Sequence, residues 1–265
     1  MAGTDRLDFG GRSLLITGGS QGIGAATARL AARRGARVMI ASPDADKLAA
    51  VSEEIGAAGG ICAWVPCDIT DPTQVTAMVR AVVDTYGSLD LAYNNAGISH
   101  PPMMPHDVPD EVWRRTVEVN VSGTFWCCRE ELKVMVAQGR GGSIVVTGSM
   151  AGIAGVGTMA PYSTSKHAIA GLVKSLAVAY GHHGIRFNFH GPGATETPMY
   201  EQSVQDVMAY RATQAATSMP GKIKGPLDRN QTAEEEAEVA CFLLSDAASS
   251  LTGAMVIADC GATAY

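Results

Sequence analysis

The residues best suited to chemistry are a tyrosine and a lysine four positions apart, Tyr162 and Lys166. They follow Pro161, which is typical of a first helical turn, and residues four apart share one helix face. Lowering the pKa of a phenol from about 10 to near 7 takes about 4 kcal/mol. One cation about 4 Å away, at an effective dielectric near 20, supplies about that much. The pair is therefore a candidate general base, although the same spacing also occurs in ordinary helices.

A second candidate is the glycine-rich segment 17–24, which reads TGGSQGIG. It follows an apolar run of strand type and opens a helical pattern. Glycines at such a turn let backbone N–H groups approach a pyrophosphate, and the helix N-terminus adds further unpaired N–H groups. The spacing is Gly-x-x-x-Gly-x-Gly, not the commoner Gly-x-Gly-x-x-Gly. Its place between strand and helix favours nucleotide binding over a turn that binds nothing.

Short apolar runs alternate with longer helical patterns along the whole chain, and these elements must position the candidates. Most of the runs lack a polar alternation, which is typical of strands buried on both faces of a parallel sheet. The predicted strands are 13–17, 37–41, 61–66, 89–94, 143–147, 185–190 and 255–258. This alternation predicts an α/β fold with a doubly wound parallel sheet of about seven strands, formed by one domain over residues 1–265.

Several helix ends are also predicted by residue type. Gly35 suits a left-handed helix end. Ser42 before Pro43 and Asp71 before Pro72 are expected to cap the next two helices, with Gln74 completing a capping box.

The stretch 191–231 breaks this rhythm, because it contains no obvious strand. A connection of this length is usually functional, and we expect it to form a lid over the site. Met199, Tyr200 and Met208 would then form a wall that favours a bulky or apolar substrate. The alternative is that these residues simply dock a helix on the core.

Composition excludes several classes of function. The 265 residues include 20 Lys and Arg against 26 Asp and Glu, a net charge of −6, which argues against nucleic acid or an anionic membrane as partner. The six cysteines are scattered and form no C-x-x-C pair, so we expect free thiols in a cytoplasmic protein and no metal site. The N-terminus does not resemble a signal peptide. The uncharged stretch 141–165 is rich in small polar residues and broken by Pro161, so we expect no membrane span.

Three further motifs accompany the Tyr162/Lys166 pair and the glycine-rich segment. The sequence NNAG occupies 94–97 after the fourth predicted strand, Ser149 stands thirteen residues before Tyr162, and Asn120 lies in the sequence VNV. Taken together, these motifs make residues 13 to about 261 resemble the short-chain dehydrogenase/reductase family, in its single-domain, Rossmann-like branch with Tyr-x-x-x-Lys.

The resemblance implies an NAD(P)-dependent oxidoreductase that transfers a hydride between a nicotinamide cofactor and a secondary alcohol or ketone. Tyr162 would be the general acid or base, and Ser149 would steady the substrate oxygen. Lys166 would hold the ribose and lower the pKa of Tyr162, while Asn120 would anchor a water that relays protons to Lys166. The resemblance also implies a homo-oligomer, either a dimer or a tetramer.

The resemblance further implies a set of cofactor contacts, in which Asp68 contacts the adenine and Pro192-Gly193 with Thr197 forms the nicotinamide turn. The full set is Gly18, Ser20, Gln21, Gly22, Ile23, Gly24, Ser42, Asp68, Ile69, Asn95, Ala96, Gly97, Tyr162, Lys166, Pro192, Gly193, Thr195 and Thr197.

The chain departs from the family pattern where the cofactor is chosen. Relatives that use NAD usually carry Asp at the end of the second strand, and those that use NADP carry Arg or Lys nearby. Here Ser42 and Pro43 occupy that place. Asp44 and Asp46 would repel a 2′-phosphate, although Ser42 could donate to one, so the sequence favours NAD over NADP. A second departure is His190-Gly191 before the nicotinamide turn.

Two alternative functions remain at this stage. An enoyl reductase would have a longer Tyr-to-Lys spacing than the one found here. A non-catalytic nucleotide-binding regulator would be expected to have lost part of the set Asn120, Ser149, Tyr162 and Lys166, and none of the four is missing.

Overall fold

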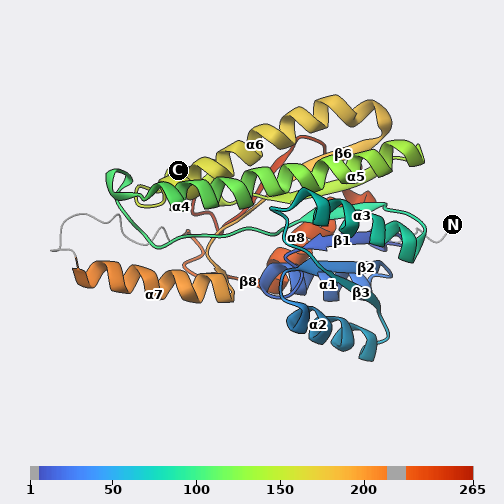
Figure 1. The fold of residues 1–265 in the computed structure, drawn as a ribbon, viewed down its shortest axis with the longest axis horizontal. Coiled ribbons are helices and arrows are strands. Elements are labelled where there is room, and N and C mark those ends of the chain that lie inside the picture. The colour runs from blue at the N-terminus through green and yellow to red at the C-terminus, as the bar shows by residue number, and fades with distance from the viewer. Residues whose placement is uncertain (1–5, 214–224, 265) are drawn as a thin grey trace.

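The computed structural model describes residues 6–213 and 225–264 (Figure 1). Seven parallel strands form one sheet, as the sequence predicts, and the structure gives their order as β3-β2-β1-β4-β5-β6-β9. They are β1 Ser13–Thr17, β2 Arg37–Ser42, β3 Ile61–Pro66, β4 Leu91–Asn94, β5 Gly142–Thr147, β6 Ile185–Pro192 and β9 Met255–Ala258. The strand order reverses between β1 and β4, the place where open α/β sheets bind ligands at their carboxyl ends.

Helices cover both faces of this sheet (Figure 1). The helices are α1 Gly22–Arg33, α2 Ala45–Ala57, α3 Pro72–Tyr86, α4 Asp110–Val117, α5 Thr124–Gln138, α6 Ala160–Tyr180, α7 Pro198–Thr213 and α8 Ala233–Leu244. Because side chains alternate along a strand, Leu15 enters a core shared with α3, α5 and α6, while Leu14 and Ile16 enter one shared with α1, α2 and α8.

The expectation of strands buried on both faces is wrong for β3. Ile61 is 55% exposed and Trp64 40% exposed, whereas every residue of β1 is buried. β3 lies at the edge of the sheet and only β2 pairs with it, so composition alone does not distinguish it from the central strands.

Helix starts agree with the sequence at one predicted cap and differ at the other. Asp71 caps α3 by accepting hydrogen bonds from the backbone N–H groups of the first turn, and Pro72 follows it. Gln74, however, accepts from the N–H of Asp68 (3.0 Å), not of Asp71. Ser42 does not cap α2, because it continues β2 opposite Pro66, and the cap is Asp44. Gly35 has a φ of 81°, as expected of a left-handed helix end.

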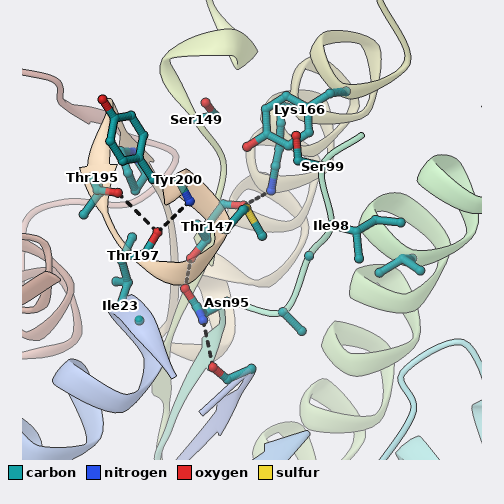
Figure 2. A pocket seen from close by; sticks show the side chains of 18 of the residues that line it. Ile23, Asn95, Ile98, Ser99, Thr147, Ser149, Lys166, Thr195, Thr197 and Tyr200 are labelled. Atoms are coloured by element: carbon teal, nitrogen blue, oxygen red, sulfur yellow. Dashed lines mark hydrogen bonds between the residues drawn. The ribbon is translucent and has the colours of Figure 1, made fainter. Parts of the chain in front are cut away.

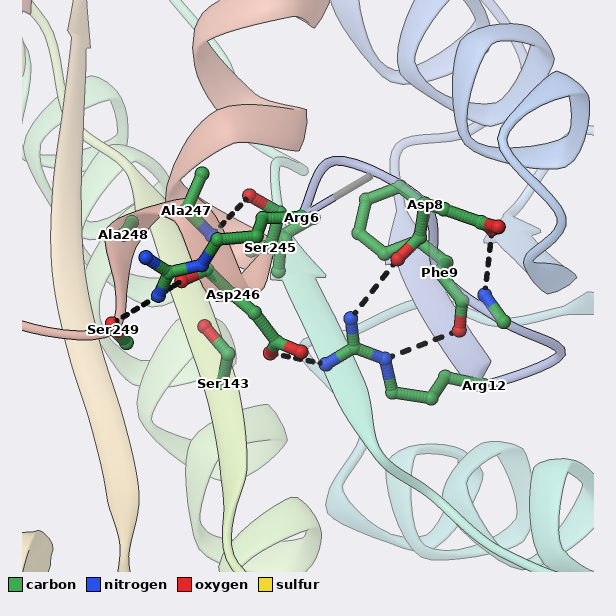
Figure 3. A network of polar contacts seen from close by, with 12 residues as sticks. Arg6, Asp8, Phe9, Arg12, Ser143, Ser245, Asp246, Ala247, Ala248 and Ser249 are labelled. Atoms are coloured by element: carbon green, nitrogen blue, oxygen red, sulfur yellow. Dashed lines mark hydrogen bonds and ion pairs between the residues drawn. The ribbon is translucent and has the colours of Figure 1, made fainter. Parts of the chain in front are cut away.

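The amino ends of the strands are closed by a polar network (Figure 3). Arg6 donates to the carbonyl of Asp246 and to Ser249 (2.7 Å), and Arg12 pairs with the Asp246 carboxylate at 2.9 Å. Arg186 donates to carbonyls at the end of α8, among them that of Leu244 (3.1 Å). Arg6 and Arg12 thus hold residues 6–12 against the turn 246–249 that follows α8, at the end of the sheet opposite the glycine-rich turn.

The segment 191–231 contains strands that the sequence did not predict. β6 continues to Pro192, and the two-residue strands β7 (Thr195–Glu196) and β8 (Gln231–Thr232) pair in parallel. Such short strands carry no sequence pattern, since they depend on a partner far along the chain. No residue of α7 between 198 and 212 is buried, and α7 lies at one side of the molecule in Figure 1. Residues 214–224 of the expected lid lie outside the described residues.

Within the described ranges, no helix has the length and apolar character needed to cross a membrane. No cluster of three or more His, Cys, Asp or Glu side chains that could hold a metal ion occurs there either.

Candidate active site

A pocket of about 520 Å³ opens at the carboxyl ends of the central strands (Figure 2). It brings together almost all of the expected cofactor contacts; only Gly24 does not line it. Ser149, Tyr162 and Lys166 line the same pocket, but Asn120 lies behind its wall. Residues that are more than 140 positions apart in the sequence therefore converge at the switch point of the sheet.

The glycine-rich turn is shaped to accept a phosphate group. Gly18 and Gly22 have φ values of 66° and 54°, a region that side chains disfavour. α1 begins after Gln21 with no side-chain cap, so its first N–H groups are free to bind an anion. A Cβ on Gly24 would lie 2.2 Å from the carbonyl oxygen of Gly18. Gly24 therefore lets α1 approach the turn closely and does not itself face the pocket.

The Tyr162 and Lys166 side chains share one face of α6, as their spacing predicts. The Lys166 Nζ lies 5.6 Å from the centre of the Tyr162 ring and donates to the carbonyl of Thr147 at 3.0 Å. Burial lowers the pKa of Lys166 to about 8, because the ammonium is desolvated. A lysine with this pKa can exchange protons near neutral pH.

The expected lowering of the Tyr162 pKa is not present in this structure. Burial raises the pKa of the phenol, and a hydrogen bond with Ser149 opposes this effect only in part. The Lys166 ammonium donates to the Thr147 carbonyl and is not among the groups that shift the Tyr162 pKa.

Ser149 is held in place by the backbone that follows β5. It caps the short 3-10 helix Met150–Gly152, and its Oγ accepts from the N–H of Ala151 at 3.1 Å. Its single hydrogen is directed at the Tyr162 oxygen, which lowers the pKa of the phenol, and could be donated to a substrate oxygen that binds beside Tyr162. Ser149 and Tyr162 can together bind one substrate oxygen.

Asn120 lies in a π-helical turn, Glu118–Gly123, between α4 and α5. Its Oδ1 accepts from the N–H of Ile98 (2.8 Å), and its Nδ2 donates to the Ile98 carbonyl (2.9 Å) and to Ser165 (3.1 Å). The amide is thus occupied in fixing the loop after β4 to the start of α6. π-Turns are frequent at functional sites because they disturb the regular pairing of backbone carbonyls.

The other end of the pocket lies at the ends of β2 and β3. Asp68 lines it, and its carboxylate accepts from the backbone and hydroxyl of Thr70 (2.9 and 2.8 Å). Ser42 and Pro43 also line it. Asp44 instead caps α2 and pairs with Lys47 at 3.0 Å, which weakens the repulsion of a phosphate that the sequence suggested.

Several pocket residues were missed in the sequence. They include Ile98, Ser99, Arg115, Thr147, Met150, Val156, Met159 and Ser203. Thr147 could have been found, since it ends the fifth strand at the edge where sites form. Met199 and Tyr200 line the pocket as expected, but the expected contribution of Met208 is wrong, because its side chain is 67% exposed and outside the pocket.

Comparison with known proteins now adds to this geometry. Residues 18–263 match a family model described as enoyl-(acyl carrier protein) reductase. A solved structure of a short-chain type dehydrogenase/reductase from Mycobacterium marinum is 35% identical, covers 98% of this chain and 99% of its own, and superposes with a TM-score of 0.88. The chain belongs to the short-chain dehydrogenase/reductase family.

Two curated relatives of this dehydrogenase are similar over nearly their whole length. A 3beta-hydroxysteroid dehydrogenase from Mediterraneibacter gnavus is 36% identical, with 98% of this chain and 100% of the relative covered. A cis-4-hydroxycyclohexanecarboxylate dehydrogenase from Sinomonas cyclohexanicum is 39% identical, with 97% and 98% covered. The protein is an oxidoreductase that acts on secondary alcohols or ketones with a nicotinamide cofactor, and the enoyl reductase and regulator alternatives are not favoured.

Proposed function

We propose that this dehydrogenase interconverts a cyclic, largely apolar secondary alcohol and its ketone, with NAD as cofactor. The observation that carries the proposal is the convergence of Ser149, Tyr162 and Lys166 on one pocket whose remaining wall includes Met159, Met199 and other apolar side chains. Both of the relatives described above are named for ring alcohols, which supports the same class of substrate.

The residues divide the work as follows. In the oxidation direction, Tyr162 takes the hydroxyl proton of the substrate as general base, and its phenol must first lose its own proton, which the raised pKa opposes. In reduction the neutral phenol, the form that burial favours, donates the proton. Ser149 donates to the same oxygen and stabilises the charge that develops there. The bound nicotinamide supplies the acceptor or donor of the hydride. Lys166 holds a proton close to the phenol, and its pKa of about 8 suits exchange at neutral pH.

Asn120 would contribute to proton relay through its backbone, which the π-helical turn Glu118–Gly123 holds in place. Its amide is already bonded to Ile98 and Ser165, so we assign any role in proton relay to its main-chain carbonyl, which also accepts from Thr124 (2.9 Å). A carbonyl has two lone pairs and can accept a second hydrogen bond, from water.

NAD is favoured by the charges around the adenosine end. Among the described residues that line the pocket, only Asp68, Arg115 and Lys166 are charged, and none of them lies at the end of β2. A 2′-phosphate would therefore meet Ser42 and Pro43 without a cationic partner.

The deciding experiment is a nicotinamide absorbance assay with NAD and NADP. Cyclohexanol and a 3-hydroxysteroid represent ring alcohols, 2-butanol represents a small acyclic one, and an enoyl thioester tests the alternative reaction. Turnover of a ring alcohol with NAD, at a higher kcat/KM than 2-butanol, is the expected result. Reduction of the enoyl thioester without any alcohol oxidation would overturn the proposal.

Three further features belong to the same proposal. The chain would act as one catalytic domain with α7 as its lid, since α7 lines the pocket through Met199 and Tyr200 and buries no residue between 198 and 212. It would form a homo-oligomer, dimer or tetramer, through helices that expose Trp113 and Phe125. Its free cysteines suit the cytoplasm. Light scattering of the purified protein tests the oligomer; a monomer would contradict it.

A further inference from the structure

A line of titratable side chains lies in the buried core beneath the cofactor pocket. Tyr93 on β4, His190 on β6 and Glu236 on α8 are each 0% exposed. The Tyr93 hydroxyl lies 2.9 Å from His190 Nδ1, and His190 Nε2 lies 2.7 Å from a carboxylate oxygen of Glu236. None of these three side chains lines the pocket, and the chemistry described above does not use them.

The line continues to the pocket through Thr147. Thr147 on β5 lies opposite His190 on β6, close enough to the Tyr93 phenol to lower its pKa through a side-chain hydrogen bond. The Thr147 hydroxyl donates to the Oδ1 of Asn95 at 3.3 Å. A hydroxyl donates one hydrogen and accepts others, so it can join two polar neighbours. Burial raises the pKa of Tyr93, and the phenol therefore remains neutral, able to donate and to accept. The buried chain thus ends at a residue that lines the cofactor pocket.

Asn95 connects this chain to the glycine-rich turn. Its Nδ2 lies 3.3 Å from the carbonyls of both Thr17 and Gly18, and its backbone N–H donates to the Thr17 hydroxyl at 3.1 Å. Figure 2 shows Asn95 between Thr147 and this turn. The Thr147 carbonyl is also the acceptor for Lys166. Asn95 and Thr147 are therefore contacts shared by the buried chain, the phosphate turn and the catalytic lysine.

Stability alone does not account for these side chains. Three polar groups in an apolar core cost desolvation, and well-packed apolar residues in their place are often neutral or stabilising. Glu236 keeps one carboxylate oxygen without a hydrogen-bond partner among the described residues, which adds to that cost. These hydrogen bonds instead fix the orientation of each successive side chain, from Glu236 as far as Asn95.

We propose that Tyr93, His190 and Glu236 are positioning residues for cofactor binding, which hold Thr147 and Asn95, and through them the glycine-rich turn, in the binding conformation. The inference rests on the proposed function, in that the pocket binds a nicotinamide dinucleotide. The three residues touch neither cofactor nor substrate. Their removal should therefore weaken dinucleotide binding and leave kcat at saturation nearly unchanged.

The first test removes a single oxygen atom. Tyr93→Phe breaks the chain between His190 and Thr147, whereas Tyr86→Phe breaks one phenol hydrogen bond, to the Val38 carbonyl (2.7 Å), away from the pocket. Titration calorimetry of the full-length protein measures the Kd for NAD or NADP, whichever the wild type binds. We expect Tyr93→Phe to raise the Kd about fivefold, as for one net hydrogen bond, with kcat within about twofold of wild type and Tyr86→Phe unchanged in Kd.

The outcomes separate the two proposals. If the wild type binds neither dinucleotide, the proposed function fails. If it binds, and Tyr93→Phe has the Kd of Tyr86→Phe, the positioning role is overturned and the proposed function stands. A loss of thermal stability in both variants with no difference in Kd counts as that second outcome.

Rescue by a conservative variant provides a second test. Glu236→Gln keeps an acceptor for His190 Nε2, and Glu236→Leu removes it. We expect the Kd of Glu236→Gln to lie nearer that of wild type than the Kd of Glu236→Leu. Equal Kd values for the two variants would contradict the proposal, and Tyr93→Phe tests it independently if Glu236→Leu does not fold.

Discussion

Two buried glutamates, Glu131 on α5 and Glu236 on α8, are anchored on opposite faces of the sheet and lead to neighbouring asparagines. Glu131 accepts directly from Asn94 Nδ2 at 2.8 Å, while Glu236 reaches Asn95 through the chain of His190, Tyr93 and Thr147. Each carboxyl is fully buried and has one oxygen without a partner among the described residues.

The two glutamates differ in whether their hydrogen-bond partner can carry a charge. Asn94 is a neutral amide, so burial raises the pKa of Glu131 to about 7 and the carboxyl is half protonated near neutral pH. Glu236 faces an imidazole, which can donate a hydrogen bond or carry a charge. The two carboxyls are therefore alike in burial and differ in partner, an amide for Glu131 and an imidazole for Glu236.

Neither carboxyl lines the pocket, whereas Tyr162 does. We expect the largest effect on turnover from a substitution of Tyr162. Tyr162→Phe removes only the hydroxyl that exchanges the proton, so turnover should fall to at most a few per cent of wild type while the dinucleotide still binds. Steady-state rates and calorimetric Kd values measure the two effects separately. Activity above that level would show that another group exchanges the proton.

The second prediction concerns the pH dependence of stability at Glu131. Its folded-state pKa, about 7, lies above the ordinary value of 4.5, so the folded protein binds more protons than the unfolded chain between these values. The free energy of unfolding should therefore fall as pH rises from about 4.5 to 7, by about 3 kcal/mol, and level off above pH 7. Glu131→Gln should lose this dependence and be the more stable protein at pH 8.

Denaturant unfolding of wild type and Glu131→Gln from pH 5 to 8 measures this difference. Glu236→Gln is the matched control, because its carboxyl has an imidazole partner and its removal should destabilise the protein at pH 8. A difference between wild type and Glu131→Gln that does not change with pH would contradict the assignment of proton uptake to Glu131.

The third prediction addresses a part of the pocket that neither anchor reaches, the end of β2. Pro43→Arg places a cation where a 2′-phosphate would lie, and Ser42→Asp places an acceptor for a ribose diol. A charge-assisted hydrogen bond contributes about 1.5–3 kcal/mol, so the ratio of kcat/KM with NAD to that with NADP should shift about tenfold, towards NADP in the first variant and towards NAD in the second. Unchanged ratios in both would mean that the ribose is recognised elsewhere.

These two asparagines also show where sequence reasoning ended. The motif NNAG predicted that 94–97 follows a central strand and lies at the pocket, and the structure brings Asn95 there. The hydrogen-bonded line behind it was not predictable, because no local pattern links Tyr93, His190 and Glu236, and Glu236 is one of four glutamates in 234–238. Their hydrogen bonds span 97 and 46 positions. The parallel register of β4, β5 and β6 brings Tyr93 and His190 to the face of the sheet that α8 covers.

The order of elements was predictable because strand and helix patterns are local. The predictions that were wrong concerned features that depend on residues far apart in the sequence. Ser42 was expected to cap α2 but pairs in β2, and β7 exists only because β8 lies beside it. The direction of the Tyr162 pKa shift was not predicted either, since spacing places Lys166 on the same helix face but does not show how deeply the phenol is buried.

The smallest expected effect is at α7, which lines the pocket through Met199 and Tyr200. Met199 lines the pocket and Met208 does not, although both are exposed residues of the same helix. Met199→Ala should raise the KM for a bulky ring alcohol about threefold, as expected when part of one apolar contact of roughly 25 cal/mol per Å² is lost, and should leave the Kd for the dinucleotide unchanged. Met208→Ala, the matched control, should change neither. Equal KM values for the two variants would show that α7 does not contribute to substrate recognition. A changed dinucleotide Kd in Met199→Ala would show that α7, as well as the residues behind the sheet, affects cofactor binding.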